Sequence, residues 1–445
     1  MLNKTNVELE RLEKLNKKYL KDDKNTVLRH ALSNAAYSDV LHVLEEENNI
    51  EQKFSIENKV LPITNQKQSG RCWIFAALNV LREIVAKELK LTDFELSQNY
   101  IAFYDKLEKV NYALNSVIEL IDKEHDDREL MFVLQTGIND GGQWDMFTNI
   151  VRKYGIVPKQ AFKETWASSH TREIDSLLNS VVRKFAADVH KLYVDNKTDE
   201  INKLKDEIMD KVYTLMCSSF GVPPKKFNFD YVDKDGKYHV LNNQTPLGFF
   251  NKFVGDKIND YVSIIHAPTK DKEYGKRYTI RLLGNVEEGH KVIHLNLPME
   301  RIKELCIKTL ENGELVWFGS DVGFYGNRTL GAWDDKLFDY ESAFGLDLKF
   351  DKADMLDYHA SAMNHAMVIV GVNVQKGQEN KWKIQNSWGV DSGEKGFYVM
   401  SNSWFDRFVY QAVIDKKYLS SEELKALEAE PIVVPPWDPM GTLAD

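Results

Sequence analysis

The spacing of hydrophobic residues changes along the chain and predicts helices first and strands later. Residues 72–89 carry apolar side chains at an uninterrupted helical period, and residues 173–220 repeat the i, i+3, i+4, i+7 pattern in two further runs. Gly221, Pro223 and Pro224 end the second run, because glycine and proline interrupt helices. We therefore expect one buried helix followed later by a helical hairpin.

A period of two replaces the helical period in the second half of the chain. Residues 231–240 alternate around Asp235 and Gly236, and an Asp-Gly pair between alternating runs indicates a β-hairpin. A last helix is expected at residues 421–429. The chain is therefore predicted to have an α+β fold. Further strand-like apolar runs lie at residues 261–265, 278–282, 291–295, 315–318, 366–374, 382–385 and 396–400.

These patterns divide the chain into five predicted regions. Residues 1–60 are polar with loose helical spacing, and they form a helical arm that is expected to pack on the rest of the chain. Residues 61–172 form a helical half, and residues 301–430 form a β-rich half. Residues 173–300 are an insertion between the two halves, helical first and extended later. Residues 431–445 contain four prolines and form an extended C-terminal arm.

Composition is that of an ordinary globular protein, with 43% hydrophobic and 28% charged residues in 445. A net charge of −10 argues against binding to nucleic acid or to an anionic membrane. The start has no apolar leader and no run is long enough to span a membrane, so a cytoplasmic location is expected. Of three cysteines, Cys217 and Cys306 each sit inside an apolar helical stretch, which is typical of small buried side chains.

The third cysteine, Cys72, stands at the predicted start of a helix, where its chemical environment is different. The positive end of the helix dipole favours a thiolate, and the thiolate is the nucleophilic form of cysteine. Ser69 and Gly70 precede it in a tight loop that is a candidate cap of the helix. Gln66 lies six residues upstream, where its amide and the Cys72 backbone N–H can form an oxyanion hole. We expect Cys72 to be a catalytic nucleophile.

Two predicted neighbouring strands supply a base and the residue that orients it. His365 begins one apolar strand, and Asn386 follows the end of the next. If the strands pair, the Asn386 carbonyl accepts a hydrogen bond from one ring nitrogen of His365 while the other nitrogen faces Cys72. Trp388 is expected to cover the histidine–asparagine bond. The order Cys, His, Asn is the cysteine variant of the catalytic triad.

Other kinds of site are less favoured by the sequence. His290 and His294 are four residues apart, but the segment between them is predicted to be a strand, so the pair does not form a chelating helical face. No metal and no cofactor are expected. The lysine-rich runs at 14–24 and 203–211 are interleaved with acidic residues and are typical of solvated helix faces. An oligomeric nucleic-acid-binding protein nevertheless stays open as an alternative.

The motifs around Cys72, His365 and Asn386 resemble those of the papain-like cysteine peptidases. The whole chain is most similar to the branch that contains bleomycin hydrolase and aminopeptidase C. The interval between Cys72 and His365 is about twice the roughly 130–150 residues of secreted members, and the insertion at 173–300 explains the excess. Further segments that resemble this branch are 65–67, 69–73, 96–98, 141–146, 154–158, 316–323 and 437–444.

This resemblance implies a two-lobed papain-like fold, in which the insertion serves oligomerisation within a hollow homohexamer. It also implies that the C-terminal arm lies in the active-site cleft. There its carboxylate pairs with the α-amino group of a peptide, so that one N-terminal residue is removed at a time. Which carboxylate of the last residue meets the amine stays open, and an endopeptidase is the alternative if the arm is displaced. The residues that the resemblance places at the substrate are Gly141, Gly142, Asn364, Trp388, Ala444 and Asp445.

Overall fold

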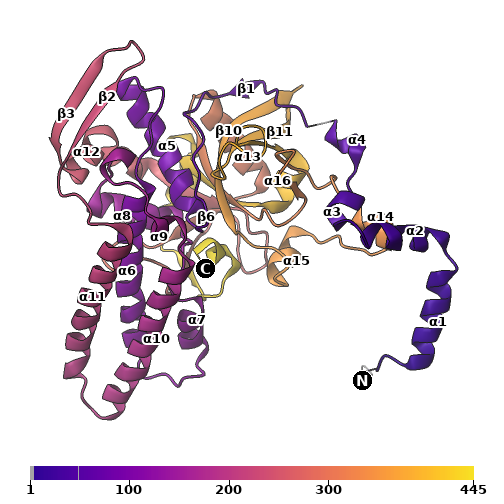
Figure 1. Cartoon of the computed structure of the whole chain (residues 1–445), viewed down its shortest axis with the longest axis horizontal. Coiled ribbons are helices and arrows are strands. Elements are labelled where there is room, and N and C mark those ends of the chain that lie inside the picture. Colours follow the sequence, from indigo (N-terminus) through magenta and orange to yellow (C-terminus); the bar gives the residue numbers. More distant parts are fainter. Residues whose placement is uncertain (1–4, 49, 445) are drawn as a thin grey trace.

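The computed structural model describes residues 5–48 and 50–444. Helices dominate the first half of the chain and strands the second (Figure 1). The α-helices are α1 (Leu9–Leu20), α2 (Asp23–Leu32), α3 (Tyr37–Val40), α4 (Leu44–Glu47), α5 (Cys72–Leu89), α6 (Gln98–Glu119), α7 (Arg128–Thr136), α8 (Trp144–Tyr154), α9 (Trp166–Ser169), α10 (Arg172–Val194), α11 (Asp199–Phe220), α12 (Pro246–Phe253), α13 (Met299–Glu311), α14 (Tyr340–Phe344), α15 (Lys352–Asp357), α16 (Asn402–Phe408) and α17 (Ser421–Ala426).

A large mixed sheet forms the second half, and a separate hairpin stands apart from it. The strands are β1 (Ile56–Glu57), β2 (Phe227–Val232), β3 (Tyr238–Gln244), β4 (Tyr261–Ile265), β5 (Arg277–Ile280), β6 (Ile293–Asn296), β7 (Val316–Ser320), β8 (Gly326–Asn327), β9 (Ala332–Trp333), β10 (His365–Gln375), β11 (Gln378–Gln385), β12 (Phe397–Ser401), β13 (Val409–Asp415) and β14 (Ile432–Val434). In the sheet they follow the order β14-β5-β6-β4-β13-β7-β10-β11-β12-β9-β8, with β1 added to β10, and β2 pairs with β3 alone.

The central strand β10 separates two hydrophobic cores. Side chains alternate between the faces of a strand, so Ala366 and Val368 join the core of the helical half, where α5 packs on the sheet. Met367 and Ile369 point to the opposite core, which α13 and α16 cover. The strand is therefore buried on both faces, which explains why its sequence is continuously apolar.

The helix at 72–89 and the hairpin of helices at 173–220 are confirmed as α5 and the pair α10–α11. The pair packs on α6 and shares the core of α5 and α8, and Figure 1 shows it as the outer layer of the helical half. The β-hairpin around Gly236 is also confirmed. Gly236 has a positive φ of 78°, which glycine adopts without strain.

Residues 261–296 have a role that local patterns did not predict. They were expected within the inserted region, but β4 pairs with β13 and thereby extends the large sheet. The pairing of β4 with β13 is observed in the structure. The boundaries of the five regions stay predictions. The far edge of the same sheet receives β14, from the predicted C-terminal arm, which lies parallel to β5.

The N-terminal helices α1 and α2 extend away from the body of the protein (Figure 1). Apolar residues of α1, including Leu9, Leu12 and Leu15, are exposed. Of the helices in the described residues, none is long and apolar enough to cross a membrane.

Candidate active site

The candidate nucleophile lies at the junction of the two halves. Helix α5 begins at Cys72, whose side chain is only 4% exposed, and its Sγ accepts a hydrogen bond at 3.4 Å from the backbone N–H of Ala366. Ala366 follows His365 directly, so the start of strand β10 lies against the thiol. The loop of Ser69 and Gly70 does not supply a side-chain cap, because Arg71 is the N-cap residue and the Ser69 hydroxyl donates to the Gln66 carbonyl instead.

The candidate base is oriented by an asparagine on the next strand. Strands β10 and β11 are antiparallel neighbours, so the start of β10 and the end of β11 lie at one edge. His365 Nε2 is 2.9 Å from Asn386 Oδ1. That oxygen also accepts from the Ser387 backbone N–H at 2.8 Å, so it is an acceptor, and Nε2 carries the proton. This tautomer leaves Nδ1 free to accept a proton.

Burial governs the protonation of this pair. It raises the pKa of the Cys72 thiol to about 11, although backbone N–H groups of Ala366 and Trp73 act in the opposite direction. Burial also lowers the pKa of His365 to about 4, against the effect of the Asn386 hydrogen bond. The start of a helix favours a thiolate at Cys72, whereas burial of the side chain opposes it. Each charge is unfavourable alone, so proton transfer between the two groups creates both charges together.

The Gln66 side chain is buried beside the same turn. Its Nε2 donates to the Ser69 carbonyl at 2.6 Å, and its Oε1 accepts from the Ser387 hydroxyl at 2.7 Å. The two bonds fix the amide, and Nε2 has a second hydrogen for a further acceptor. Ser387 was missed in the sequence, although it follows Asn386 directly.

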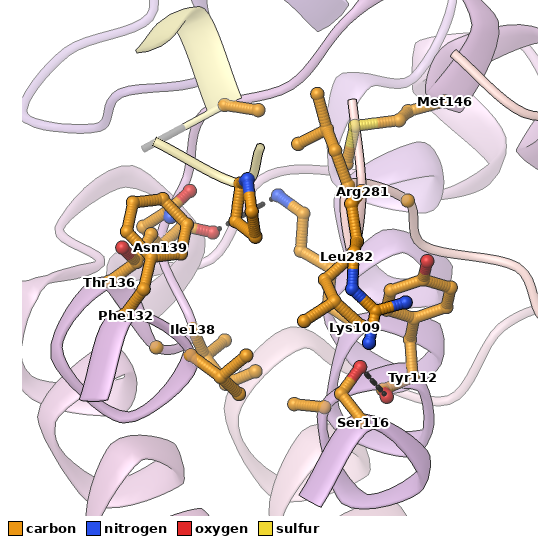
Figure 2. A pocket seen from close by; sticks show the side chains of 17 residues that line it. Lys109, Tyr112, Ser116, Phe132, Thr136, Ile138, Asn139, Met146, Arg281 and Leu282 are labelled. Carbon is orange, nitrogen blue, oxygen red and sulfur yellow. Dashed lines mark hydrogen bonds between the residues drawn. The ribbon is translucent and has the colours of Figure 1, made fainter. Parts of the chain in front are cut away.

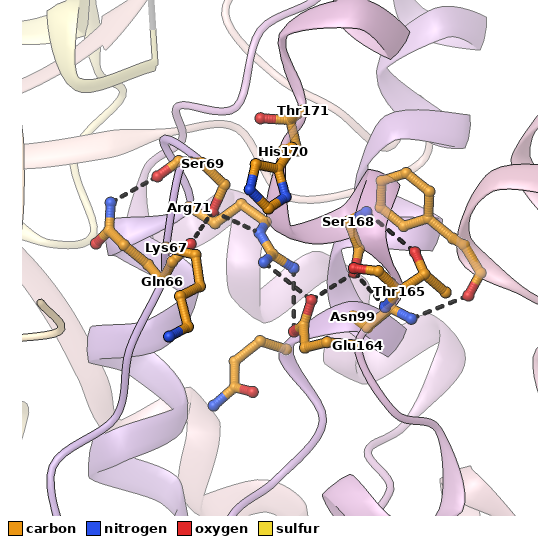
Figure 3. A network of polar contacts seen from close by, with 12 residues as sticks. Gln66, Lys67, Ser69, Arg71, Asn99, Glu164, Thr165, Ser168, His170 and Thr171 are labelled. Carbon is orange, nitrogen blue, oxygen red and sulfur yellow. Dashed lines mark hydrogen bonds and ion pairs between the residues drawn. The ribbon is translucent and has the colours of Figure 1, made fainter. Parts of the chain in front are cut away.

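An ion pair braces the turn from outside the candidate triad. Figure 3 shows Arg71 between Ser69 and Glu164. Its Nε donates to the Ser69 hydroxyl at 2.9 Å, and its two terminal nitrogens contact the Glu164 carboxylate at 3.3 and 3.0 Å. A bidentate arginine–carboxylate contact defines orientation as well as distance. The residue immediately before Cys72 is therefore held in one position.

The C-terminal arm reaches this site and contacts both halves of the molecule. Its last part, Pro439–Ala444, is a 3-10 helix, so the prediction of a fully extended arm is wrong here. The carbonyl of Leu443 accepts from the Gly142 N–H at 2.9 Å. The Thr442 hydroxyl donates to the carbonyl of Met363 at 2.9 Å, two residues before His365. These two hydrogen bonds hold the arm at the edge of the site.

The structure places the predicted substrate residues in different environments: some contact the C-terminal arm, and others bind residues of the same half. Gly141 and Gly142 contact the arm, and a Cβ on Gly141 would lie 2.5 Å from the Leu443 carbonyl. The Asn364 side chain is already used, because it accepts from the Val322 N–H at 3.0 Å and donates to Asp321.

Trp388 packs beside His365, with ring centroids 4.8 Å apart. The guanidinium of Arg328 also lies over the Trp388 ring, 3.9 Å from its centroid, and no sequence spacing indicates this contact. Ala444 is buried at the end of the arm, whereas Asp445 lies outside the described residues.

The two histidines that were considered as a metal pair have different neighbours. His294 is fully buried in β6, and its Nδ1 lies 2.7 Å from the Ser263 hydroxyl. His290 lies before that strand. Within the described ranges, no group of three His, Cys, Asp or Glu side chains is arranged to hold a metal ion.

Comparison with known proteins agrees with this geometry. The chain matches the Peptidase C1-like family over residues 6–441. The chain belongs to this family. Within it, aminopeptidase C of Lactobacillus delbrueckii subsp. lactis is 46% identical over 399 residues, 89% of each chain. Bleomycin hydrolase of Mus musculus is 40% identical over 393 residues, 86% of each chain. The predicted membership of the bleomycin hydrolase and aminopeptidase C branch is therefore confirmed.

A solved structure with a similar sequence supports the fold. The crystal structure of PepW from Lactobacillus rhamnosis HN001 covers 98% of this chain, and 99% of that chain is matched. The sequence identity is 43% and the TM-score is 0.96. The mixed helix-and-sheet architecture is thus that of a papain-like cysteine peptidase.

Proposed function

We propose that this protein is a cysteine aminopeptidase that removes single residues from the free N-terminus of peptides. The observation that carries the proposal is the buried arm, whose Leu443 carbonyl is bound by Gly142 next to the start of α5. A chain segment that fills one side of a cleft excludes peptides that extend in that direction. Relatives named aminopeptidase C over most of the chain support the same activity.

Cys72, His365 and Asn386 are the proposed catalytic residues. Nδ1 of His365 accepts the thiol proton as Cys72 Sγ attacks the peptide carbonyl, and the imidazolium then protonates the leaving amine. The resulting acyl-enzyme is hydrolysed when His365 takes a proton from water. The 2.9 Å bond between Asn386 and Nε2 supports the role of Asn386, because it holds the imidazole in the required tautomer.

The free end of the arm is proposed to recognise the substrate's amino group. Ala444 is buried, and the residue that follows it, Asp445, carries a carboxylate. A carboxylate there pairs with an ammonium group, and a charge-assisted hydrogen bond is worth about 1.5–3 kcal/mol. Peptides with a blocked N-terminus lack that charge and also collide with the arm. An endopeptidase is the alternative if the arm is displaced.

We also propose the homohexameric assembly that the family resemblance implies. The exposed apolar residues of α1, an N-terminal helix that projects from the body, support a role in subunit contacts (Figure 1). The cytoplasmic location stays a prediction from the sequence.

The function is tested with two fluorogenic substrates, an aminoacyl amide with a free amine and the same amide with a blocked amine. The intact protein is expected to cleave only the free-amine substrate, and a thiol alkylator is expected to abolish that cleavage. Equal cleavage of both substrates would overturn the aminopeptidase assignment and favour the endopeptidase. Cleavage that survives complete alkylation of Cys72 would overturn the mechanism.

Replacing Gln66 with alanine is expected to lower kcat about a hundredfold to a thousandfold, as for the loss of one oxyanion donor. The matched control is Gln68→Ala, because Gln68 lies two residues away in the same loop with its side chain exposed. We expect Gln68→Ala to keep kcat within about twofold, since exposed substitutions away from the site have small effects. Equal kcat values for the two variants, measured per active site, would show that Gln66 does not stabilise the oxyanion.

A further inference from the structure

Two lysines on one face of α6 bind the loop of residues 139–142. Lys109 Nζ donates to the Asn139 carbonyl at 3.2 Å and to the Gly141 carbonyl, so it contacts the backbone on both sides of Asp140. Lys106, one turn earlier, forms an ion pair with the Asp140 carboxylate at 2.8 Å. Figure 2 shows Lys109 and Asn139 at a small cavity of about 70 Å³, which Ala444 also lines.

Asp140, which lies between these contacts, forms hydrogen bonds with residues on both sides of Cys72. Its carboxylate accepts from the Gly70 N–H at 2.8 Å, two residues before Cys72. Its backbone carbonyl accepts from the indole N–H of Trp73 at 2.6 Å, one residue after Cys72. A shift of Asp140 therefore moves the backbone on both sides of the nucleophile, at Gly70 and Trp73.

The same loop also carries the C-terminal arm. Gly142 donates to the Leu443 carbonyl at 2.9 Å, and Gly141 has so little space that an added Cβ would lie 3.0 Å from Ala444 Cα. The nucleophile and the arm are thus attached to consecutive residues of one short segment. Their separation is decided by the conformation of residues 139–142.

The contacts of Lys106 and Asp140 are charged and buried, and they also reach helix α10. Lys106 is 1% exposed and also pairs with Asp175 of α10, and the Asp140 carboxylate accepts from the Thr171 hydroxyl. Burial alone would raise the pKa of Asp140, but Lys106 holds the pKa of that carboxyl below its usual value. Since buried ion pairs are often no more stabilising than apolar replacements, stability alone does not account for this arrangement.

We propose that Lys106, Lys109 and Asp140 are positioning residues that set the distance between the Cys72 thiol and the C-terminal arm. The proposal rests on the aminopeptidase function, because that distance determines whether a single residue fits between the thiol and the end of the chain. Asp140 acts through Gly70 and Trp73, and Lys106 acts through Asp140. The helix pair α10–α11 joins the site through Asp175.

The test compares Lys106→Met with Lys303→Met. Lys303 is a matched control, because it is also a buried lysine between two carboxylates, Glu379 at 3.0 Å and Asp406 at 2.9 Å, but it lies in the β-rich half. For Lys106→Met, we expect kcat on the free-amine substrate to fall about a hundredfold per folded molecule, the loss that a misplacement of about 1 Å causes. We also expect its relative activity on the blocked substrate to rise. Lys303→Met is expected to keep both quantities close to those of the unmodified protein.

A second measurement separates this proposal from the aminopeptidase function. The rate of Cys72 alkylation is followed by mass spectrometry of the peptide that contains Cys72, which requires no substrate. Slower alkylation in Lys106→Met but not in Lys303→Met supports the positioning role even if the substrate assignment fails. Equal alkylation rates and equal substrate ratios in the two variants would overturn it.

If Lys106→Met does not fold, Thr171→Ala gives the same comparison with a smaller loss of folding stability. It removes the hydroxyl that donates to Asp140, together with the methyl group of Thr171. A smaller change in the same direction supports the proposal, and unchanged alkylation and substrate ratios overturn it.

Discussion

Replacing Cys72 with alanine is expected to reduce turnover about 10⁶-fold, to the background rate, and to leave the fold intact. Without the thiol there is no covalent intermediate, and loss of a nucleophile costs about as much as loss of the whole triad. The change removes a single heavy atom, the sulfur, from a side chain that is 4% exposed, so the free energy of unfolding should change little. Activity and circular dichroism on the same sample measure both effects.

The other two cysteines provide the control. Cys217 is half-buried in α11 and Cys306 is fully buried in α13, so both lie in helices away from Cys72. Cys217→Ala should retain full activity and full sensitivity to alkylation. Substantial activity in Cys72→Ala, or resistance to alkylation in Cys217→Ala, would show that Cys72 is not the nucleophile.

Removing residues 443–445 is expected to change the type of cleavage rather than to abolish it. The Cys72 thiol and His365 remain, so the chemistry persists. The free-amine substrate should lose about tenfold to a hundredfold in kcat/KM, because the loss of a charge-assisted hydrogen bond costs about 1.5–3 kcal/mol. The blocked substrate, which the intact protein is expected to exclude, should become cleavable. Values of kcat/KM for both substrates, before and after truncation, provide the measurement.

Gly141→Ala tests the same idea without shortening the chain. The new Cβ would lie 2.5 Å from the Leu443 carbonyl, so the arm must shift to accommodate it. We expect this variant to move the substrate ratio in the same direction as the truncation, by a smaller factor. If neither variant cleaves the blocked substrate, the arm does not determine the exopeptidase specificity.

The sequence alone determined features that depend on local periodicity and on the order of motifs. The helix that starts at Cys72 ends at Leu89, as its uninterrupted apolar period predicts. The pairing of His365 with Asn386 could also be predicted, because two consecutive apolar strands joined by a short turn pair antiparallel. Together with the Cys72 turn, these elements were sufficient to recognise the family.

Only the tertiary structure decided the features that depend on distant contacts. Strand β4 joins β13 from about 150 residues away in the chain, and alternation within a strand does not specify such a partner. Burial of Cys72 and His365 opposes the charged form of each side chain, and this burial arises from segments that are far apart in the sequence. Asp140 could not be predicted for the same reason. A carboxylate before two glycines has no distinctive spacing in the sequence, and its proposed positioning role depends on Lys106 and Gly70, which only the fold brings to it.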